Sequence, residues 1–306
     1  MPRLVQLVAA LILIVLLPES AFAWGAGVHL GTGLRILAAP ELLPQALQTL
    51  LTGYPLDYLY GTIAADITLG KKHTHHLEHC HNWRIGRKIL ERGKKHGPEA
   101  EACAYGYLSH LAADTIAHNY FVPYKLAMTY NTTLHNHAYW EIRADIGVKK
   151  ETWTIAQNLA RRDNSKLDKV LRGSISDTIF SFGTNKQIFN SMMLISRLQR
   201  WQKMIETIAT HSRWPFNQQE HDEYMALALE ATLGILSDEE SPYWNADPTG
   251  DRALTAAGLI RKNLKLLWLD GKLRQEDANL ILKELRNRFK LGITNPDEIL
   301  PLFTAV

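Results

Sequence analysis

Cysteine is scarce in this chain of 306 residues, and so is any excess of charge of one sign. The two cysteines, Cys80 and Cys103, are too few for a disulfide-rich scaffold. They leave open either one bridge in an oxidising compartment or two buried thiols, because sequence spacing does not fix a distance in space. The formal net charge of +3 is too small to indicate binding to nucleic acid or to an anionic membrane by itself.

Strand-like alternation of apolar and polar residues is also missing at useful length. Beyond residue 23, no segment is apolar for the roughly 20 residues that a membrane-spanning helix needs. The chain instead repeats apolar residues at three- and four-residue spacings, and 46% of its residues are hydrophobic. We therefore predict an all-α multi-helix bundle with no transmembrane segment in the mature chain.

Proline, glycine and polar stretches divide this helical pattern into segments. The expected helices cover residues 28–38, 40–51, 55–67, 83–94, 98–121, 135–149, 154–161, 187–212, 218–236, 252–269 and 275–290. Pro123 is expected to end the long helix that begins at Pro98. The His-rich stretch 71–81 is expected to be a loop.

The first 23 residues have the pattern of an export signal rather than of a fold. Arg3 supplies a positive charge, Leu4 to Leu17 form a short apolar run, and an A-x-A cleavage signal ends at Ala23. We predict cleavage between Ala23 and Trp24, and a periplasmic or secreted mature protein.

Residues 24–236 are expected to form the main helical domain. Residues 237–306 are predicted to be a linker and a helical hairpin, either a small appended unit or the last layer of the same bundle. The carboxy-terminal region also holds large and basic side chains. Trp201, Trp214 and Trp268 are expected in the core, and Lys262, Lys265, Arg286 and Arg288 on a solvated helix surface.

Histidine is concentrated in one part of the chain. Eleven of the thirteen histidines lie between His29 and His137, interleaved with Asp and Glu. Isolated histidines in a core are usually structural, whereas a cluster of this composition more often binds metal.

His110, Asp114 and His118 follow one another at four-residue spacing. On a helix, this spacing places the three side chains on one stripe, next to the space left by Gly106. The stripe fits either a shared metal ion or a salt-bridged ladder on a half-buried face.

His137, Glu141 and Asp145 repeat the spacing. The first two can chelate a metal from one helix face, and Asp145 is either their supporting partner or a surface charge. His135 competes with His137, but no acidic residue follows His135 at four residues. A second stripe of this type favours the metal interpretation of both.

Asp66 stands at the end of an expected helix, where a histidine of the following loop can join it at a metal. Spacing alone does not select that histidine. The candidates are His73, His75, His76, His79 and His81.

Cleavage after Ala23 would expose the α-amine of Trp24, which titrates near pH 8 and can therefore bind zinc when deprotonated. His29 can reach the same metal after about one helical turn.

Taken together, these motifs resemble the zinc-dependent phospholipase C family and the related S1/P1 nucleases. The resemblance covers about residues 24 to 145. It is carried by WGAGVH (24–29), AAD (64–66), HCHNW (79–83), SHLAAD (109–114) and His137-x-x-x-Glu141. The three residues between Asp114 and His118 resemble the phospholipase-type domain of glycosylphosphatidylinositol-specific phospholipase D, whereas the bacterial phospholipases and the S1/P1 nucleases both have five.

The resemblance implies an all-helical site for up to three zinc ions. Asp66, His81, His110 and Asp114 would hold one ion; Trp24, His29 and Asp114 a second; His118, His137 and Glu141 the third. His76 and His79 are the alternatives to His81. A water between the bridged pair would be the nucleophile, and Asp66 would act as general base.

The implied activity is hydrolysis of phospholipid phosphodiester bonds, with peripheral contact to the membrane. Two alternatives remain. The first is an S1/P1-type single-strand nuclease, favoured by the spacing of Trp24 and His29 and disfavoured by that of Asp114 and His118. The second is a non-catalytic zinc-binding protein, which the loop of five histidines keeps open.

Overall fold

The computed structural model describes residues 24–68, 80–132, 137–175, 181–196 and 218–304, together with positions 207, 210, 212, 214 and 216. These residues form helices and no strand, which confirms the predicted all-α class. The expected signal peptide and most of the His-rich loop lie outside the described residues. Within the described part, no helix is both long and apolar enough to cross a membrane.

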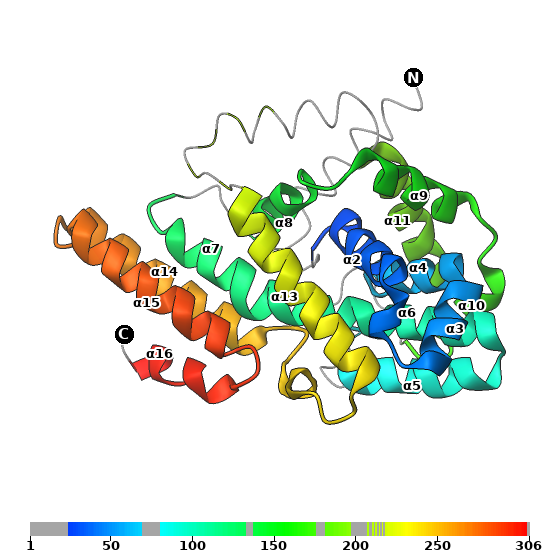
Figure 1. The fold of residues 1–306 in the computed structure, drawn as a ribbon. Coiled ribbons are helices and arrows are strands. Elements are labelled where there is room, and N and C mark those ends of the chain that lie inside the picture. The colour runs from blue at the N-terminus through cyan, green and yellow to red at the C-terminus, as the bar shows by residue number, and fades with distance from the viewer. Residues whose placement is uncertain are drawn as a thin grey trace, which may run out of the picture.

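Most expected helices are present with ends shifted by a few residues (Figure 1). The first half contains α2 (Ala26–Ala38), η1 (Pro40–Leu42), α3 (Gln45–Gly53), α4 (Pro55–Ala64), η2 (Ala65–Ile67), α5 (Trp83–Lys95), α6 (Pro98–Ile116), η5 (Ala117–Phe121), α7 (Val122–Met128) and α8 (His137–Asp145). The second half contains α9 (Lys150–Arg161), α10 (Ser165–Arg172), α11 (Phe182–Ser196), α13 (Gln218–Ser237), η6 (Pro242–Asn245), α14 (Asp251–Leu269), α15 (Gln275–Leu291), η7 (Pro296–Ile299) and α16 (Pro301–Thr304).

Three of the observed helices differ from the helices expected from the sequence. The helix expected over 40–51 is divided before Pro44, and the helix expected over 135–149 ends at Asp145. Helix α10 was not expected, although its strongly amphipathic sequence buries Leu167, Val170 and Leu171. Periodicity over only eight residues is too short to distinguish a helix from a loop.

The prediction that Pro123 ends the long central helix is wrong. Helix α6 passes into a π-helix, η5, and the chain then continues as α7. Proline removes one backbone donor and disturbs the preceding turn. The wider π turn bypasses this problem, because the amide of Val122 bonds to the carbonyl of Ala117, five residues back.

Helices α4 and α6 approach each other closely at Gly61 and Gly106. A Cβ atom on Gly106 would lie 2.0 Å from the carbonyl oxygen of Tyr58, and one on Gly61 would lie 2.0 Å from that of Cys103. Neither contact is with the flexible end of a side chain, so the two backbones can meet only because both residues are glycine. The crossing places the end of α4 beside the middle of α6.

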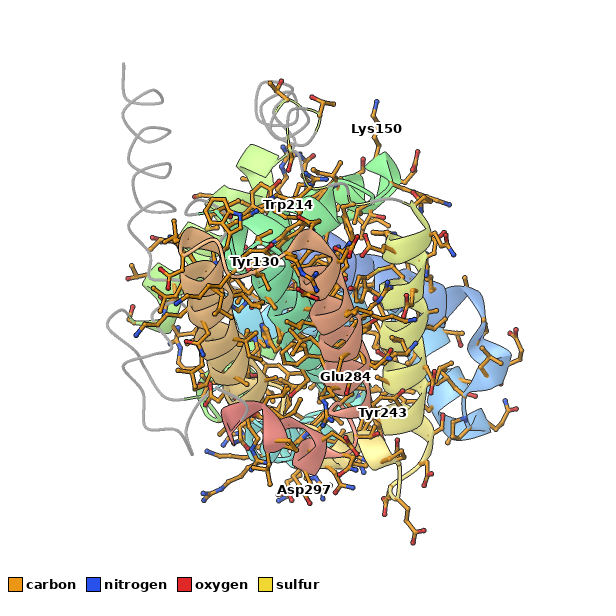
Figure 2. All side chains as sticks on the ribbon, turned by 90° about the vertical axis from the view of Figure 1, so that its left-hand side faces the viewer. Tyr130, Lys150, Trp214, Tyr243, Glu284 and Asp297 are labelled. Carbon is orange, nitrogen blue, oxygen red and sulfur yellow. The ribbon has the colours of Figure 1, made fainter. Side chains whose placement is uncertain are left out.

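Helices α14 and α15 pack as a layer on α7 and η5. Residues of all four elements belong to one hydrophobic core (Figure 2). Arg286 was expected on a solvated surface, but it donates to the hydroxyl of Tyr120 on η5 and to Glu223 on α13. Both partners lie on other elements, which sequence spacing cannot reveal. Division of the chain at residue 236 stays a prediction.

The expectations for the other carboxy-terminal side chains have mixed outcomes. Trp268 is 42% exposed, so its assignment to the core is wrong. Trp214 is partly buried against the core, and Trp201 lies outside the described residues. Cys80 and Cys103 are both buried thiols, and no disulfide joins them.

We expect Gly106→Ala to lower the free energy of unfolding by at least about 2 kcal/mol, because the added methyl group meets backbone rather than a movable side chain. Denaturant unfolding measures the change. Gly258→Ala is the matched control, since this glycine lies within α14 and a Cβ there would meet nothing within 4 Å. Alanine at 258 should leave stability unchanged or raise it slightly. Equal effects of the two substitutions would contradict the assigned role of the crossing.

Candidate metal centre

Four of the expected ligands converge on one point from η2, α6 and the segment before α5. The donor atoms are Asp66 Oδ1, His81 Nε2, His110 Nε2 and Asp114 Oδ2. His81 Nε2 lies 3.1 Å from His110 Nε2, 3.1 Å from the Asp114 oxygen and 3.3 Å from the Asp66 oxygen. His110 Nε2 lies 3.1 Å from Asp114 Oδ2 and 3.8 Å from Asp66 Oδ1. All four residues are buried.

The separations that involve a histidine are close to those between the ligands of one zinc ion. Zinc–ligand bonds of about 2.0–2.1 Å place neighbouring ligand atoms of a tetrahedron about 3.3 Å apart, close to the spacing of these donors. The tautomer of His110 also fits, because its Nδ1 lies 2.8 Å from the carbonyl oxygen of Thr62. That carbonyl can only accept, so Nδ1 carries the proton and Nε2 presents a lone pair to the group.

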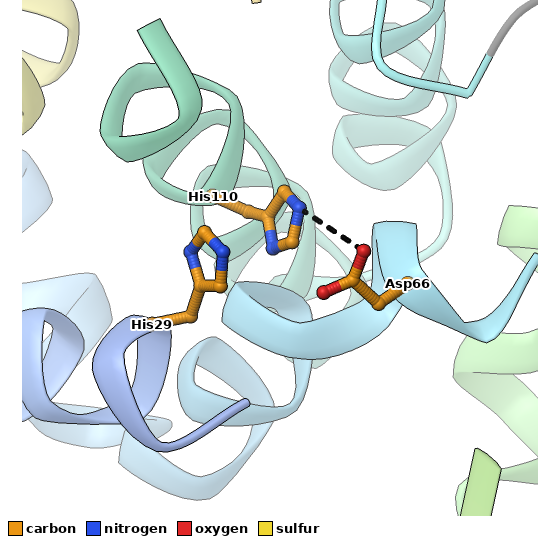
Figure 3. A group of neighbouring side chains, drawn as sticks. All are labelled: His29, Asp66 and His110. Atoms are coloured by element: carbon orange, nitrogen blue, oxygen red, sulfur yellow. Dashed lines mark ion pairs between the residues drawn. The ribbon is translucent and has the colours of Figure 1, made fainter. Parts of the chain in front are cut away.

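His29 joins the same centre from α2. Its ring stacks on that of His110 with centroids 3.8 Å apart (Figure 3). His29 Nε2 also lies 3.3 Å from Asp114 Oδ1. The two oxygens of Asp114 thus face two different sets of histidines. Among the described residues, neither ring nitrogen of His29 and neither oxygen of Asp114 has a hydrogen-bond partner of acceptable geometry. Buried polar atoms normally have one, so this arrangement has the character of a ligand shell.

The protonation states support that interpretation. Burial and the neighbouring His110 lower the pKa of His29, which favours the neutral imidazole that binds metal. Burial alone would raise the pKa of Asp114, but His110 and His29 outweigh it and hold that pKa well below its ordinary value. Asp114 is therefore an anion.

Asp145 is not a surface charge, and the partner it contacts is the start of α2 rather than the pair of His137 and Glu141. It is partly buried, and its Oδ1 accepts a hydrogen bond of 3.0 Å from the amide of Val28 in the first turn of α2. Removal from water raises the pKa of this carboxyl to about 7, while the amides of Val28 and Gly27 favour its anion. The contact ties the end of α8 to the helix that presents His29.

A second group lies on η5 and α8. His137 Nε2 is 2.6 Å from Glu141 Oε1, and His118 Nε2 is 4.0 Å from the same oxygen. The two rings meet edge to face with centroids 5.4 Å apart. One ligand atom from each of the three residues lies within 4.8 Å of the others, so the group can hold a metal ion. The helical stripe of His110, Asp114 and His118 therefore contributes to two separate groups. His110 and Asp114 belong to the first group, and His118 belongs to the second.

The segment expected to be a domain linker holds His118 in place. The carbonyl of Pro248 accepts a 2.6 Å hydrogen bond from His118 Nδ1, and the carbonyl of Asp247 accepts one from Asn119. Gly250 has a φ of +62°, and a Cβ there would lie 2.4 Å from the backbone oxygen of His118. Sequence reasoning missed this role. The Pro-Thr-Gly turn was visible, but its partner 130 residues away was not.

The remaining expected ligands are placed as follows. Trp24 directly precedes α2, and its buried ring packs against Phe121. The α-amine of Trp24 as a ligand stays a prediction. His76 and His79 lie outside the described residues, whereas His81 lies in the first group.

Comparison with known families agrees with this geometry. The sequence model described as zinc dependent phospholipase C matches residues 28–183. The chain belongs to the zinc-dependent phospholipase C family. The match extends beyond the motifs recognised in the sequence, through α9 and α10 and to the start of α11. No curated protein and no solved structure matches the chain. Zinc is the metal that the family implies, and the imidazole and carboxylate donors of both groups are ligands that zinc takes.

We expect Gly250→Ala to weaken zinc binding at the His118 group by about 10–100-fold, because the methyl group would push the Pro248 carbonyl away from His118. Zinc retained after dialysis against graded chelator measures the effect. Gly271→Ala is the control: its φ is +67°, so the backbone strain is similar, but a Cβ there meets nothing within 4 Å. Loss of zinc from both variants, or from neither, would show that Gly250 does not position His118.

Proposed function

We propose that the chain is an exported, zinc-dependent phosphodiesterase of the phospholipase C type that hydrolyses phosphodiester bonds of phospholipids. The observation that carries the proposal is the convergence of Asp66, His81, His110 and Asp114, with 3.1–3.8 Å between the donor atoms of every pair that includes a histidine. All four residues lie within residues 28–183, the part of the chain that the family model matches. A phospholipase C-type activity follows from the family, and the site geometry supports the specific residue roles below.

The assignment uses three zinc ions. Asp66, His81, His110 and Asp114 bind the first; Trp24, His29 and Asp114 the second; His118, His137 and Glu141 the third. The opposed contacts of the two Asp114 oxygens support its bridging role. The separate location of the His118 group supports a third ion.

When bound, zinc would supply Lewis acidity toward a phosphodiester and lower the pKa of a water molecule toward 7. Asp66 is the proposed general base, and its carboxylate is buried at the edge of the first group with Oδ1 toward His81 and His110. It would accept the proton of the attacking water. The carbonyls of Thr62 and Pro248 keep the protons of His110 and His118 on Nδ1, so that both Nε2 atoms stay available as ligands.

Export would complete the second zinc site. Cleavage after Ala23 would create the α-amine of Trp24 directly before α2, the helix that presents His29. The amide contact between Val28 and Asp145 fixes this end of α2, which supports a defined position for the amine.

The zinc-loaded protein should release diacylglycerol from phosphatidylcholine vesicles, and a chelator should abolish the release until zinc is restored. Chromatography of the lipid products measures it, and Asp114→Asn provides a catalytically inactive control. Degradation of single-stranded DNA with lipids untouched would instead identify a nuclease. Tight zinc binding without hydrolysis of any diester would identify a zinc-binding protein.

A chain that keeps a methionine before Trp24 should contain one zinc ion fewer than the cleaved chain and lose most of its activity. The reason is that an amide nitrogen replaces the α-amine. Metal analysis combined with amino-terminal sequencing measures both quantities. The two chains share every residue from Trp24 onward, so thermal unfolding of the two forms provides the control for folding. Equal zinc content would refute the role of the amine.

A further inference from the structure

The pair of helices α14 and α15 ends in an exposed apolar segment at one extreme of the molecule (Figure 1). We define residues 266–272 as the hairpin tip, and every one of them is exposed. Leu266 is 52% exposed and Leu269 is 62% exposed, and Leu280 on the neighbouring α15 is 68% exposed. The last core residue of α14 is Leu264. Beyond it, the helix extends past the rest of the bundle.

The apolar side chains of the tip surround the helix rather than form one face. Leu266, Leu267, Trp268 and Leu269 are consecutive, so they span about 300° around the helix axis. A partner helix or a second copy of the chain would cover one side of such a segment. A fluid medium covers all sides, as hydrocarbon and lipid headgroups do.

The last amides of the tip are bonded within the tip itself. The amides of Asp270, Gly271 and Lys272 donate to the carbonyls of Leu266, Trp268 and Leu267, respectively. Gly271 adopts a φ of +67°, which closes this helix end as a Schellman motif. A turn with its amides bonded internally can leave water at a lower cost than an open loop.

Basic side chains that can contact lipid phosphates surround the tip. Residues 262–277 contain four basic residues and three acidic residues. Lys272 and Arg274 contact Asp270 and Asp277, but these pairs are exposed and therefore weak. Leucine and tryptophan side chains flanked by lysine and arginine are typical of segments that lie at a membrane interface.

We propose that the hairpin tip docks on phospholipid membranes, with Trp268 and the three adjacent leucines entering the headgroup region. The proposal rests on the proposed phospholipase function, because that substrate is presented at a membrane surface. It assigns to α14 and α15 a task separate from the metal groups.

The test compares Trp268→Ser/Leu269→Ser with the control Leu291→Ser/Leu300→Ser, whose exposed leucines lie away from the tip. Zinc-loaded full chains are floated with vesicles of phosphatidylcholine, alone or mixed with phosphatidylglycerol. The tip variant should bind at least about tenfold more weakly, and the control should bind as the unchanged chain does. Added salt should weaken binding to the mixed vesicles more than to pure phosphatidylcholine.

A fluorophore at Asp270→Cys gives an independent readout, because both native cysteines are buried. Its emission should shift to the blue with vesicles and stay unchanged without them. Hydrolysis of a short-chain, monomeric phosphatidylcholine should be equal in the tip variant and the unchanged chain. For vesicle substrate, the tip variant should have a raised KM.

Failure of this proposal is distinct from failure of the proposed function. Vesicle hydrolysis by the tip variant at the unchanged KM would overturn the docking role and leave the enzyme assignment intact. Vesicle binding that depends on the tip, without hydrolysis of any lipid, would support docking and refute the activity. A dimer that dissociates in the tip variant, with no vesicle binding by the unchanged chain, would overturn docking and assign the tip to contact between copies.

Discussion

The buried carboxylate of Asp114 is the constraint on which the site depends. A carboxylate without water is unfavourable unless nearby groups compensate its charge. Imidazoles lie on both sides of this carboxylate, with His29 facing one oxygen and His81 and His110 facing the other. Hydrogen bonds of acceptable geometry do not satisfy either oxygen among the described residues. A cation between the rings would satisfy the anion and the lone pairs together, which explains why so many ligand-type side chains are buried at one place.

The rest of the bundle sets the positions of those ligands through backbone contacts. The glycine crossing of α4 and α6 brings the carbonyl of Thr62 to His110, and the turn before α14 brings the carbonyl of Pro248 to His118. Carbonyl oxygens are inert in the chemistry, but each fixes which ring nitrogen carries the proton. The metal groups therefore depend on helix packing as much as on their own side chains. The carboxy-terminal layer belongs to this support, because it begins at the Pro248 turn.

The helices and ligand pairs that the sequence predicted are those defined by local spacing. His110 with Asp114, and His137 with Glu141, are one helical turn apart, so periodicity alone places each pair on one face. The π-helix was missed because Pro123 normally disrupts an α-helix, and only the tertiary structure shows the wider turn that accommodates it. Support by Thr62 and Pro248 was missed because backbone carbonyls have no sequence signature. Trp268 was assigned to the core because hydrophobicity does not show where a helix leaves the bundle.

Helix α14 connects the His118 metal group with the proposed membrane contact. It begins at the turn that binds His118 and ends at the hairpin tip, about 27 Å further along its axis at 1.5 Å per residue. At that distance, the tip cannot deliver a bound lipid directly to the ligands of the His118 group. Its contribution would be residence of the enzyme at the surface, which raises the local concentration of substrate without changing the chemical step. The helix would also fix the angle between the bundle and a docked membrane, since the Pro248 turn at its base is held by His118 and Asn119. In the proposed arrangement, docking and catalysis are mechanically linked by one element but chemically independent of each other.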